Sequence, residues 1–194
     1  MSHQRIRTAN TRDGFLTPDL DFESSQAVVA GDQVFLMGCT GLALDGKGFI
    51  GEGDPAAQAE QAMRNMQILL EEAGAQMEDI CLINNFTTNR TDREQVYPVV
   101  ARHLQEVNPV STGLIVKDLA APYIRFEIDA WAVIPRDPQR GHQRFRVRNA
   151  KGGFAVPGMN LDCARVIRAN DHLFFQGQTG MTLDGRSFVG AGDP

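Results

Sequence analysis

The sequence predicts an α+β fold in which two helices pack on one face of a mixed sheet, and it predicts that this unit is repeated in tandem. The first part of the chain has the order β-β-β-α-β-α-β-β, which gathers both helices on a single sheet face. The start of the chain then recurs near its end at a constant offset, so that residue 38 returns as residue 177 (177 − 38 = 139).

Three strands are predicted first, at residues 5–9, 25–30 and 33–38. The second and third have the sequences SQAVVA and QVFLMG. Gly31 and Asp32 separate them, and a two-residue turn of this kind predicts a hairpin.

A helix is predicted at residues 54–74, with Asp54 as its N-cap, Pro55 in its first turn and Gly74 at its end. Its apolar residues recur at helical spacing and should face the core. They are Ala59, Ala62, Met63, Met66, Leu69, Leu70 and Ala73. The remaining elements are a strand at 79–87, a helix at 92–106, and strands at 111–118 and 123–134. Pro98 should disturb the first turns of the second helix.

The composition is that of a soluble globular protein, with 42% apolar residues, 22% charged residues and a net charge of −5. No basic stripe is visible, so nucleic acid is not an expected partner. The N-terminus lacks the apolar core of a signal peptide, and no run reaches membrane-spanning length. We therefore expect a cytoplasmic protein without a membrane partner. Cys39, Cys81 and Cys163 form no metal or disulfide pattern, so we expect buried thiols and no metal.

The best-conserved part of the repeat is GCTGLALDGKGFIGEGDP at residues 38–55, which returns as GQTGMTLDGRSFVGAGDP at 177–194. The matched residues are varied, so gene duplication explains them and low complexity does not. The strands of residues 142–194 should therefore superpose on those of residues 3–55.

This repeat predicts the domain organisation. Residues 1–136 form a complete domain, residues 137–141 form a linker, and residues 142–194 form the N-terminal part of a second domain. Pro55 opens a helix in the first copy, and its equivalent Pro194 is the last residue given, so we expect the second copy to be incomplete here.

Several blocks resemble the Rid (YjgF-like) family. SQAV at residues 25–28 and AGD at 30–32 are similar to the family's SQAV and AGD block. EAGA at 72–75 resembles the end of its first helix, and FEIDA at 126–130 resembles its closing strand. The resemblance covers residues 1–136 and returns over the second copy.

The resemblance implies a chorismate-mutase-like fold and trimers with ligand clefts between subunits. It also implies hydrolysis of small enamines and imines, such as 2-aminoacrylate, to a keto acid and ammonia, without a cofactor. In such enzymes an arginine binds the substrate carboxylate, because a guanidinium makes a two-point contact with it. A glutamate on the last strand positions water.

Carried over residue by residue, the catalytic glutamate matches Glu127. The arginine position falls on Ser111, so the usual carboxylate anchor is missing. The substrate-binding positions are Gly38, Cys39, Tyr97, Ser111 and Thr112.

Arg125 is a candidate replacement anchor, as is Lys117, because alternation along a strand places Arg125 on one face with Glu127 and Asp129. Arg125 or Lys117 could bind an acidic ligand group. The favoured interpretation is that both are solvated or pair with Glu127 and Asp129, because charge pairs across strands are common.

Asn84 and Asn85 are adjacent in a strand, so one of them must face inward and needs a hydrogen-bond partner. A structural hydrogen bond and a role in lining the cleft are equally favoured for it.

We expect a hydrolase of small enamine, imine or related C–N compounds that acts in a cleft between Rid units and is not a standard 2-aminoacrylate deaminase. The alternative is a non-catalytic Rid module that binds a small ligand or serves assembly. Ribonuclease activity is the least favoured, because the chain is acidic. The expected partners are a small-molecule ligand and further copies of the chain in threefold or pseudo-threefold packing.

Overall fold

The structure is a computed structural model that describes residues 3–14, 19–137, 139, 141–149, 162–183, 187–190 and 192. Parts of residues 142–194, including residues 150–161, 193 and 194, lie outside the described residues. No described helix is long and apolar enough to cross a membrane.

The first unit has the predicted order of strands and helices. Its elements are β1 (Gln4–Asn10), β2 (Glu23–Ala30), β3 (Gln33–Leu36), α1 (Pro55–Glu72), β4 (Ile80–Thr87), α2 (Arg93–His103), β5 (Val110–Ile115) and β6 (Phe126–Val133). Short 3-10 turns occur at Thr11–Asp13, Met77–Asp79 and Arg90–Asp92.

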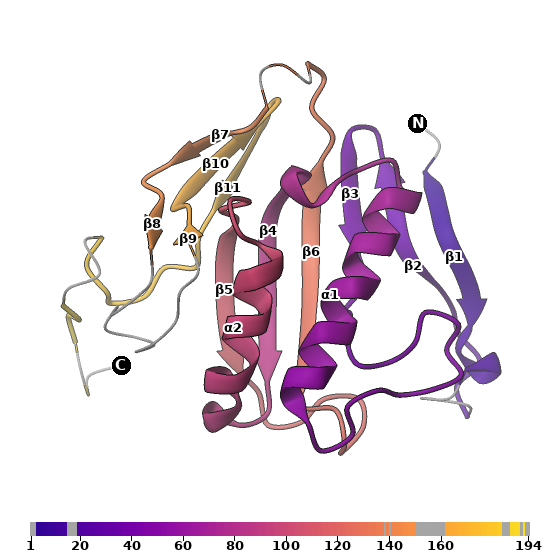
Figure 1. Ribbon diagram of the computed structural model, residues 1–194. Helices are drawn as coiled ribbons and strands as arrows, with labels where there is room; N and C mark the ends of the chain where they lie inside the picture. Colours follow the sequence, from indigo (N-terminus) through magenta and orange to yellow (C-terminus); the bar gives the residue numbers. More distant parts are fainter. Residues whose placement is uncertain are drawn as a thin grey trace.

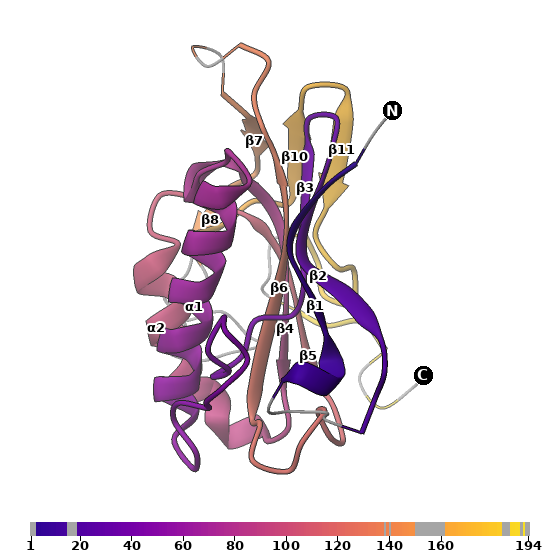
Figure 2. The ribbon, with the colours of Figure 1, turned by 90° about the vertical axis from the view of Figure 1, so that its right-hand side faces the viewer.

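The strands form one sheet in the order β1-β2-β3-β6-β4-β5. Only β4 and β5 pair in parallel, and the other pairs are antiparallel, so the sheet is mixed. Both helices lie on the same face of it (Figure 1), and the view along the sheet leaves its other face free of helices (Figure 2). The predicted α+β fold is confirmed.

Local signals explain where these elements begin and end. The Asp54 carboxylate accepts hydrogen bonds from the backbone N–H groups of Ala56 and Ala57 at 3.0 and 3.1 Å, which caps α1. Gly31 has φ = +67°, which the tight turn between β2 and β3 requires and which glycine adopts without strain. Pro98 lies inside α2, so the expected disturbance did not end the helix, because a proline keeps helical φ and removes a single N–H donor.

The core lies between α1, α2 and the sheet. The predicted stripe of α1 is buried, with Met63, Met66, Leu69 and Leu70 fully inaccessible. Strand residues such as Phe126 point toward the same layer. The three cysteines are buried and free, as predicted.

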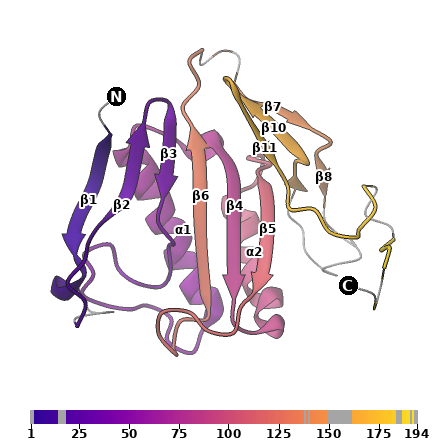
Figure 3. The ribbon, with the colours of Figure 1, turned by 180° about the vertical axis from the view of Figure 1, so that it is seen from behind.

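The later segment contains five short strands beside the first unit (Figure 3). They are β7 (Gln143–Phe145), β8 (Arg148–Asn149), β9 (Asp162–Cys163), β10 (Val166–Ala169) and β11 (His172–Phe175). The sheet β11-β10-β7 and the pair β8-β9 are separate from the six-stranded sheet.

A second, smaller core joins this segment to the first unit. Phe174 of β11 packs edge-on against Trp131 of β6, with ring centroids 5.5 Å apart. Ala164 donates a backbone hydrogen bond to Pro109 at 3.1 Å. The side chain of Asn170 donates to the Asp32 carboxylate at 2.8 Å, so the two hairpin turns are also linked.

Candidate functional site

Glu127 lies on β6 and points away from the helices. Its neighbours Phe126 and Ile128 are fully buried on the helix side, so alternation places Glu127 on the opposite face. Gly38 lies against its carboxylate, and a Cβ atom added there would come within 2.1 Å of Oε1. Cys39 exchanges backbone hydrogen bonds with Ile128 at 2.7 and 2.9 Å. Three predicted site residues, Glu127, Gly38 and Cys39, are therefore brought together.

The surroundings of Glu127 favour its protonated form. Burial raises the pKa of the Glu127 carboxyl, and the charge of Asp129 raises it further. A carboxyl group whose pKa is raised is suited to accept and return a proton. Burial also raises the pKa of the Cys39 thiol to about 12, so it is not a nucleophile at neutral pH.

Ser111, at the position where the family carries its arginine, faces α2 from β5. It accepts a hydrogen bond from the side chain of Asn85 at 3.2 Å. Asn85 is buried, and its Oδ1 has no hydrogen-bond partner among the described residues. Tyr97 of α2 fills the space beside Gly113, because a Cβ there would lie 2.8 Å from its hydroxyl. Asn85 thus makes a structural hydrogen bond and also lines the cleft described next.

A cavity of about 340 Å³ opens between this part of the first unit and the later segment. One wall comes from β4, α2 and β5, and the other from Cys163 of β9, Arg165 and the segment that follows β11. The predicted residues Tyr97, Ser111 and Thr112 line it, together with Gln176, Gly177 and Gln178 of the later segment. We call this cavity the inter-segment cleft.

Gly177 and Gly38 occupy equivalent places under the 139-residue offset (38 + 139 = 177). A Cβ at Gly177 would lie 2.7 Å from the Thr112 hydroxyl oxygen, so the close approach of the two walls requires glycine there. Glu127, Gly38 and Cys39 are not among the lining residues described for this cleft. The predicted site residues therefore fall into two groups.

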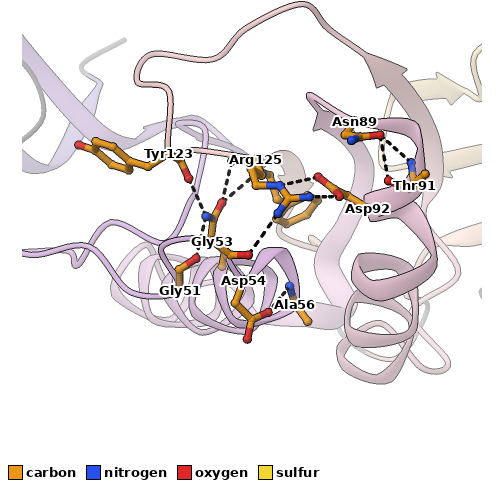
Figure 4. A network of polar contacts seen from close by, with 11 residues as sticks. Gly51, Gly53, Asp54, Ala56, Asn89, Thr91, Asp92, Tyr123 and Arg125 are labelled. Atoms are coloured by element: carbon orange, nitrogen blue, oxygen red, sulfur yellow. Dashed lines mark hydrogen bonds and ion pairs between the residues drawn. The ribbon is translucent and has the colours of Figure 1, made fainter.

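Arg125 does not pair with Glu127 or Asp129, so that expectation is wrong. Its guanidinium binds the fully buried Asp92, with Nε 2.9 Å from Oδ2 and a second contact from Nη2 to Oδ1, and it donates to the carbonyl of Gly53 at 3.1 Å (Figure 4). Arg125 precedes β6, where the chain turns toward the start of α2, and this removes it from the strand alternation. Asp129 instead accepts from Asn84 at 2.8 Å.

The buried amide of Gln58 fixes the same corner of the fold. Its Nε2 donates to the carbonyls of Gly51 and Tyr123 at 2.9 and 2.8 Å. Its Oε1 accepts from the backbone N–H groups of Arg125 and Phe126 at 2.8 and 3.2 Å. The first turn of α1 is thus tied to the start of β6, and Glu127 follows directly.

Sequence reasoning missed two arginines of the inter-segment cleft, Arg93 and Arg165. Arg93 precedes Tyr97 by four residues in α2, so both lie on one helix face, and this spacing was a usable signal. Arg165 replaces Gln26 of the first copy under the repeat offset (26 + 139 = 165), but nothing local indicates that it faces a cavity.

The structure thus shows a two-helix α+β unit in which a half-buried glutamate on the last strand lies against Gly38. The family model described as Endoribonuclease L-PSP matches residues 20–134, more than half of the chain. The chain belongs to this family, the Rid (YjgF-like) proteins.

Individual relatives agree with this assignment. The chain is 31% identical over 110 residues to a 2-iminobutanoate/2-iminopropanoate deaminase from Dermatophagoides farinae, covering 57% of this chain and 84% of the relative. It is similar to a YjgF-family structure from Mycobacterium tuberculosis, with a TM-score of 0.56, 26% identity, and coverage of 69% of this chain and 100% of that one. RidA from Psychrobacter sp. shares the fold, with a TM-score of 0.55 and 24% identity over 67% of this chain and 100% of that chain.

Proposed function

We propose that this protein is a hydrolase of small enamine, imine or related C–N compounds, with Glu127 as its acid–base residue. The observation that carries this proposal is the raised pKa of Glu127, whose carboxylate lies directly against Gly38. The relative from Dermatophagoides farinae supports it, because its name describes an imine deaminase.

The proposed reaction adds water across a C=N bond. The Glu127 carboxylate takes a proton from water while the water oxygen bonds to the imine carbon. The resulting carboxyl returns that proton to the nitrogen, which gives a carbinolamine. Glu127 then moves the proton of the carbinolamine hydroxyl to the nitrogen, the C–N bond breaks, and ammonia leaves as the carbonyl forms. Glu127 ends in its starting state, so one imine and one water give one carbonyl compound and one ammonia.

We also propose that the Glu127 group works in a cleft with another Rid unit. Glu127 lies on the sheet face that no helix of the first unit covers. Packing of Rid units around a threefold or pseudo-threefold axis would place a second wall against it. In the same scheme residues 1–136 are one unit, residues 137–141 a linker, and residues 142–194 the beginning of a second unit. Light scattering should then give an oligomer, and a monodisperse monomer at micromolar concentration would contradict the packing.

The protein is not expected to be a standard 2-aminoacrylate deaminase. Ser111 cannot make the two-point charged contact of an arginine, and loss of such a contact costs on the order of a thousandfold in rate. Ammonia release from freshly generated 2-aminoacrylate should therefore stay near background. Ser111→Arg should not restore it, because Ser111 faces α2 and Glu127 lies on the opposite face of the sheet. Substantial wild-type turnover would overturn this proposal.

A non-catalytic ligand-binding role is the second candidate, and the inter-segment cleft favours it. Its described lining contains no carboxylate that could activate water. A set of C–N substrates that bind but are not hydrolysed, with binding unchanged in Glu127→Gln, would support this alternative over the hydrolase.

A further inference from the structure

The sheet β11-β10-β7 packs on the first unit with one face and exposes large apolar side chains on the other. Phe174 points toward the first unit and belongs to the second core. The alternate residues point the other way, and the strand register places Phe145, Val166 and Phe175 side by side in one row. Leu173 lies in the next row, and Phe145, Leu173 and Phe175 are all exposed. We call the face that carries these four apolar residues the outer face.

Each apolar residue of the outer face has an equivalent in the core of the first unit. Subtracting 139 from their numbers gives four buried residues of the core that α1 covers: Ile6, Ala27, Val34 and Leu36. In every pair the residue of the later segment is apolar and larger, with Phe for Ile, Val for Ala, Leu for Val and Phe for Leu. Strand positions that face water are usually polar, so apolar residues at all four positions indicate a face that something covers.

An arginine beside the outer face indicates which kind of element covers it. In the first unit, the guanidinium of Arg7 binds the carboxylate of Glu72 at the end of α1, with Nε and Nη2 2.8 and 2.6 Å from its two oxygens. Arg146 is the equivalent of Arg7 (7 + 139 = 146) and shares its positive φ. Arg146 is exposed and forms no salt bridge within the described residues. It is therefore placed to bind an acidic residue at the end of a helix.

The loop after β11 has the same backbone contacts as the loop that leads into α1. The N–H group of Ile50 donates to the carbonyl of Gly41 at 2.8 Å, and that of Val189 donates to Gly180 at 2.7 Å. Both glycines pack tightly, because an added Cβ would lie 2.2 and 2.3 Å from the carbonyl oxygens of Ile50 and Val189. The later loop therefore has this conformation although no helix follows it among the described residues.

In the first unit, this loop holds α1 through two backbone carbonyls. The buried side chain of Asn65 donates from Nδ2 to the carbonyls of Thr40 and Leu42 at 3.3 and 2.7 Å. Thr179 and Met181 carry the equivalent carbonyls, and their turn is the same. The N–H of Met181 donates to Oγ1 of Thr179 at 3.2 Å, as Leu42 does to Thr40 at 3.1 Å. A helix with an asparagine at the matching position would bind this loop in the same way.

We propose that the outer face binds an amphipathic helix of a partner protein, packed as α1 packs in the first unit. The expected helix has apolar residues at spacings of three and four, which cover the outer face. It also has an asparagine that reaches the carbonyls of Thr179 and Met181, and an acidic residue two turns later that reaches Arg146. In α1 these two positions are Asn65 and Glu72.

A second copy of this chain does not fit the outer face. The apolar stripe of α1 is fully engaged in the core of its own unit, so a copy could supply that helix only by opening this core. Two outer faces packed against each other would bring Arg168, which lies beside Leu173, into one interface with its equivalent. The outer face is also distinct from the Glu127 face, so the proposal does not depend on hydrolysis or on threefold packing.

A peptide with the sequence of residues 54–74 is the probe for this site. Its N-terminus carries fluorescein, and its fluorescence anisotropy is measured as the 194-residue chain is added. The peptide should bind, and its helix content by circular dichroism should rise on binding, because an isolated helix of this length is marginal in water. A peptide of the same composition in scrambled order should not bind.

Leu173→Asp should weaken binding of this peptide by at least about tenfold, because it places a charge in the apolar contact. Leu20→Asp is the matched control, since Leu20 and Leu173 are 56% and 58% exposed and Leu20 lies before β2 in the first unit. The control should change the affinity by less than about twofold. Thermal unfolding of both variants separates lost binding from lost folding.

A charge exchange tests the contact at the end of the helix. Arg146→Glu should weaken peptide binding by about threefold or more, because an attractive charge pair becomes a repulsive one. Glu72→Arg in the peptide should restore the affinity for this variant. Arg90→Glu, at an exposed arginine of the first unit, is the control and should have little effect.

Three outcomes would overturn the proposal. Absence of peptide binding, or binding that Leu173→Asp leaves unchanged, would remove the helix from the outer face. Self-association of the chain that Leu173→Asp abolishes would assign this face to a second copy. A loss in Arg146→Glu that the Glu72→Arg peptide does not restore would contradict the assigned packing of the helix. Peptide binding is measured without substrate, so its failure is distinguishable from failure of the hydrolase proposal, which is measured by ammonia release.

Discussion

The strands β1–β3 and the strands β7–β11 begin and end at equivalent residues, but only the first set is covered by a helix. Adding 139 to the bounds of β2 (23 and 30) gives 162 and 169, the start of β9 and the end of β10. Adding it to those of β3 (33 and 36) gives 172 and 175, the bounds of β11. Arg7 and Arg146 (7 + 139 = 146) share an unusual positive φ, at 49° and 53°.

Burial separates the two regions. Val34 and Leu36 are 0% and 7% exposed under α1, whereas their equivalents Leu173 and Phe175 are 58% and 59% exposed. Strand alternation and turn chemistry therefore set the hairpin in both places, and the helix supplies the hydrophobic stabilisation in only one. The same local sequence pattern can be a core or a surface, depending on what packs on it.

The largest predicted difference follows from this contrast. Val34→Asp places a charge in the core and should lower the free energy of unfolding by about 3–5 kcal/mol. Leu173→Asp, at the equivalent exposed position, should change it by less than about 0.5 kcal/mol. Urea unfolding of the two variants measures both. Equal destabilisation would mean that the later segment is covered in solution.

Substitution of the two equivalent glycines, Gly38 and Gly177, by alanine should have different effects. Gly38→Ala brings a Cβ against the Glu127 carboxylate, so it should cost about 1–3 kcal/mol in stability and displace the acid–base group. Gly177→Ala should instead bring a Cβ against the Thr112 hydroxyl oxygen in the inter-segment cleft and leave Glu127 in place. Thermal unfolding of both variants and NMR titration of Glu127 separate the two effects. A shift of the Glu127 pKa in the Gly177→Ala variant would contradict this expected difference.

The aspartates of the two hairpin turns, Asp32 and Asp171 (32 + 139 = 171), should differ by a smaller amount. Burial opposes ionisation of Asp32, but hydrogen bonds from Asn170 and His172 outweigh it, and the pKa of Asp32 is lowered. Asp32→Asn should cost about 1 kcal/mol at pH 7, whereas Asp171→Asn should cost less than about 0.5 kcal/mol, because Asp171 is exposed.

The pH dependence of the Asp32 contribution has a definite sign. A carboxyl group with a lowered folded-state pKa stabilises the protein above its ordinary pKa, near 3.9, and that stabilisation is lost as the pH falls through the lowered value. The difference between wild type and Asp32→Asn should therefore vanish in strong acid. A difference that persists at the lowest pH would point to lost packing instead.

The smallest expected effect concerns Glu127 itself. Its raised pKa means that folding favours the protonated form, so stability falls as the pH rises from the ordinary glutamate value, near 4.3, through the raised one. Glu127→Gln should then stabilise the neutral-pH protein by up to about 1 kcal/mol while removing any hydrolysis. Thermal unfolding at pH 4 and pH 8 measures the change. A destabilised Glu127→Gln at pH 8 would contradict it.

Local signals were sufficient to predict the fold. Asp54, Gly31 and Gly74 marked the helix and turn boundaries, and alternation in FEIDA placed Glu127 opposite the core. These signals depend on neighbours in sequence, which a single chain displays directly.

The site could be predicted only in part, because it depends on contacts between distant residues. Arg125 was assigned by strand alternation, but its actual partner Asp92 lies 33 residues away in another element. Arg93 and Arg165 meet across a cavity that exists only once the later segment packs beside β5. No periodicity in the sequence encodes that packing.

The position of β6 has a consequence for how the protein is made. It lies between β3 and β4, although it is the last strand of its unit to leave the ribosome. The edges of β3 and β4 therefore stay open during synthesis, and the next hairpin to emerge, β10–β11, repeats the residue pattern of the part of β2–β3 nearest its turn. Repeated units are prone to this kind of misassembly. The yield of chains with correctly paired strands should thus depend on how promptly residues 126–133 are synthesised. A chaperone that shields open strand edges should raise this yield.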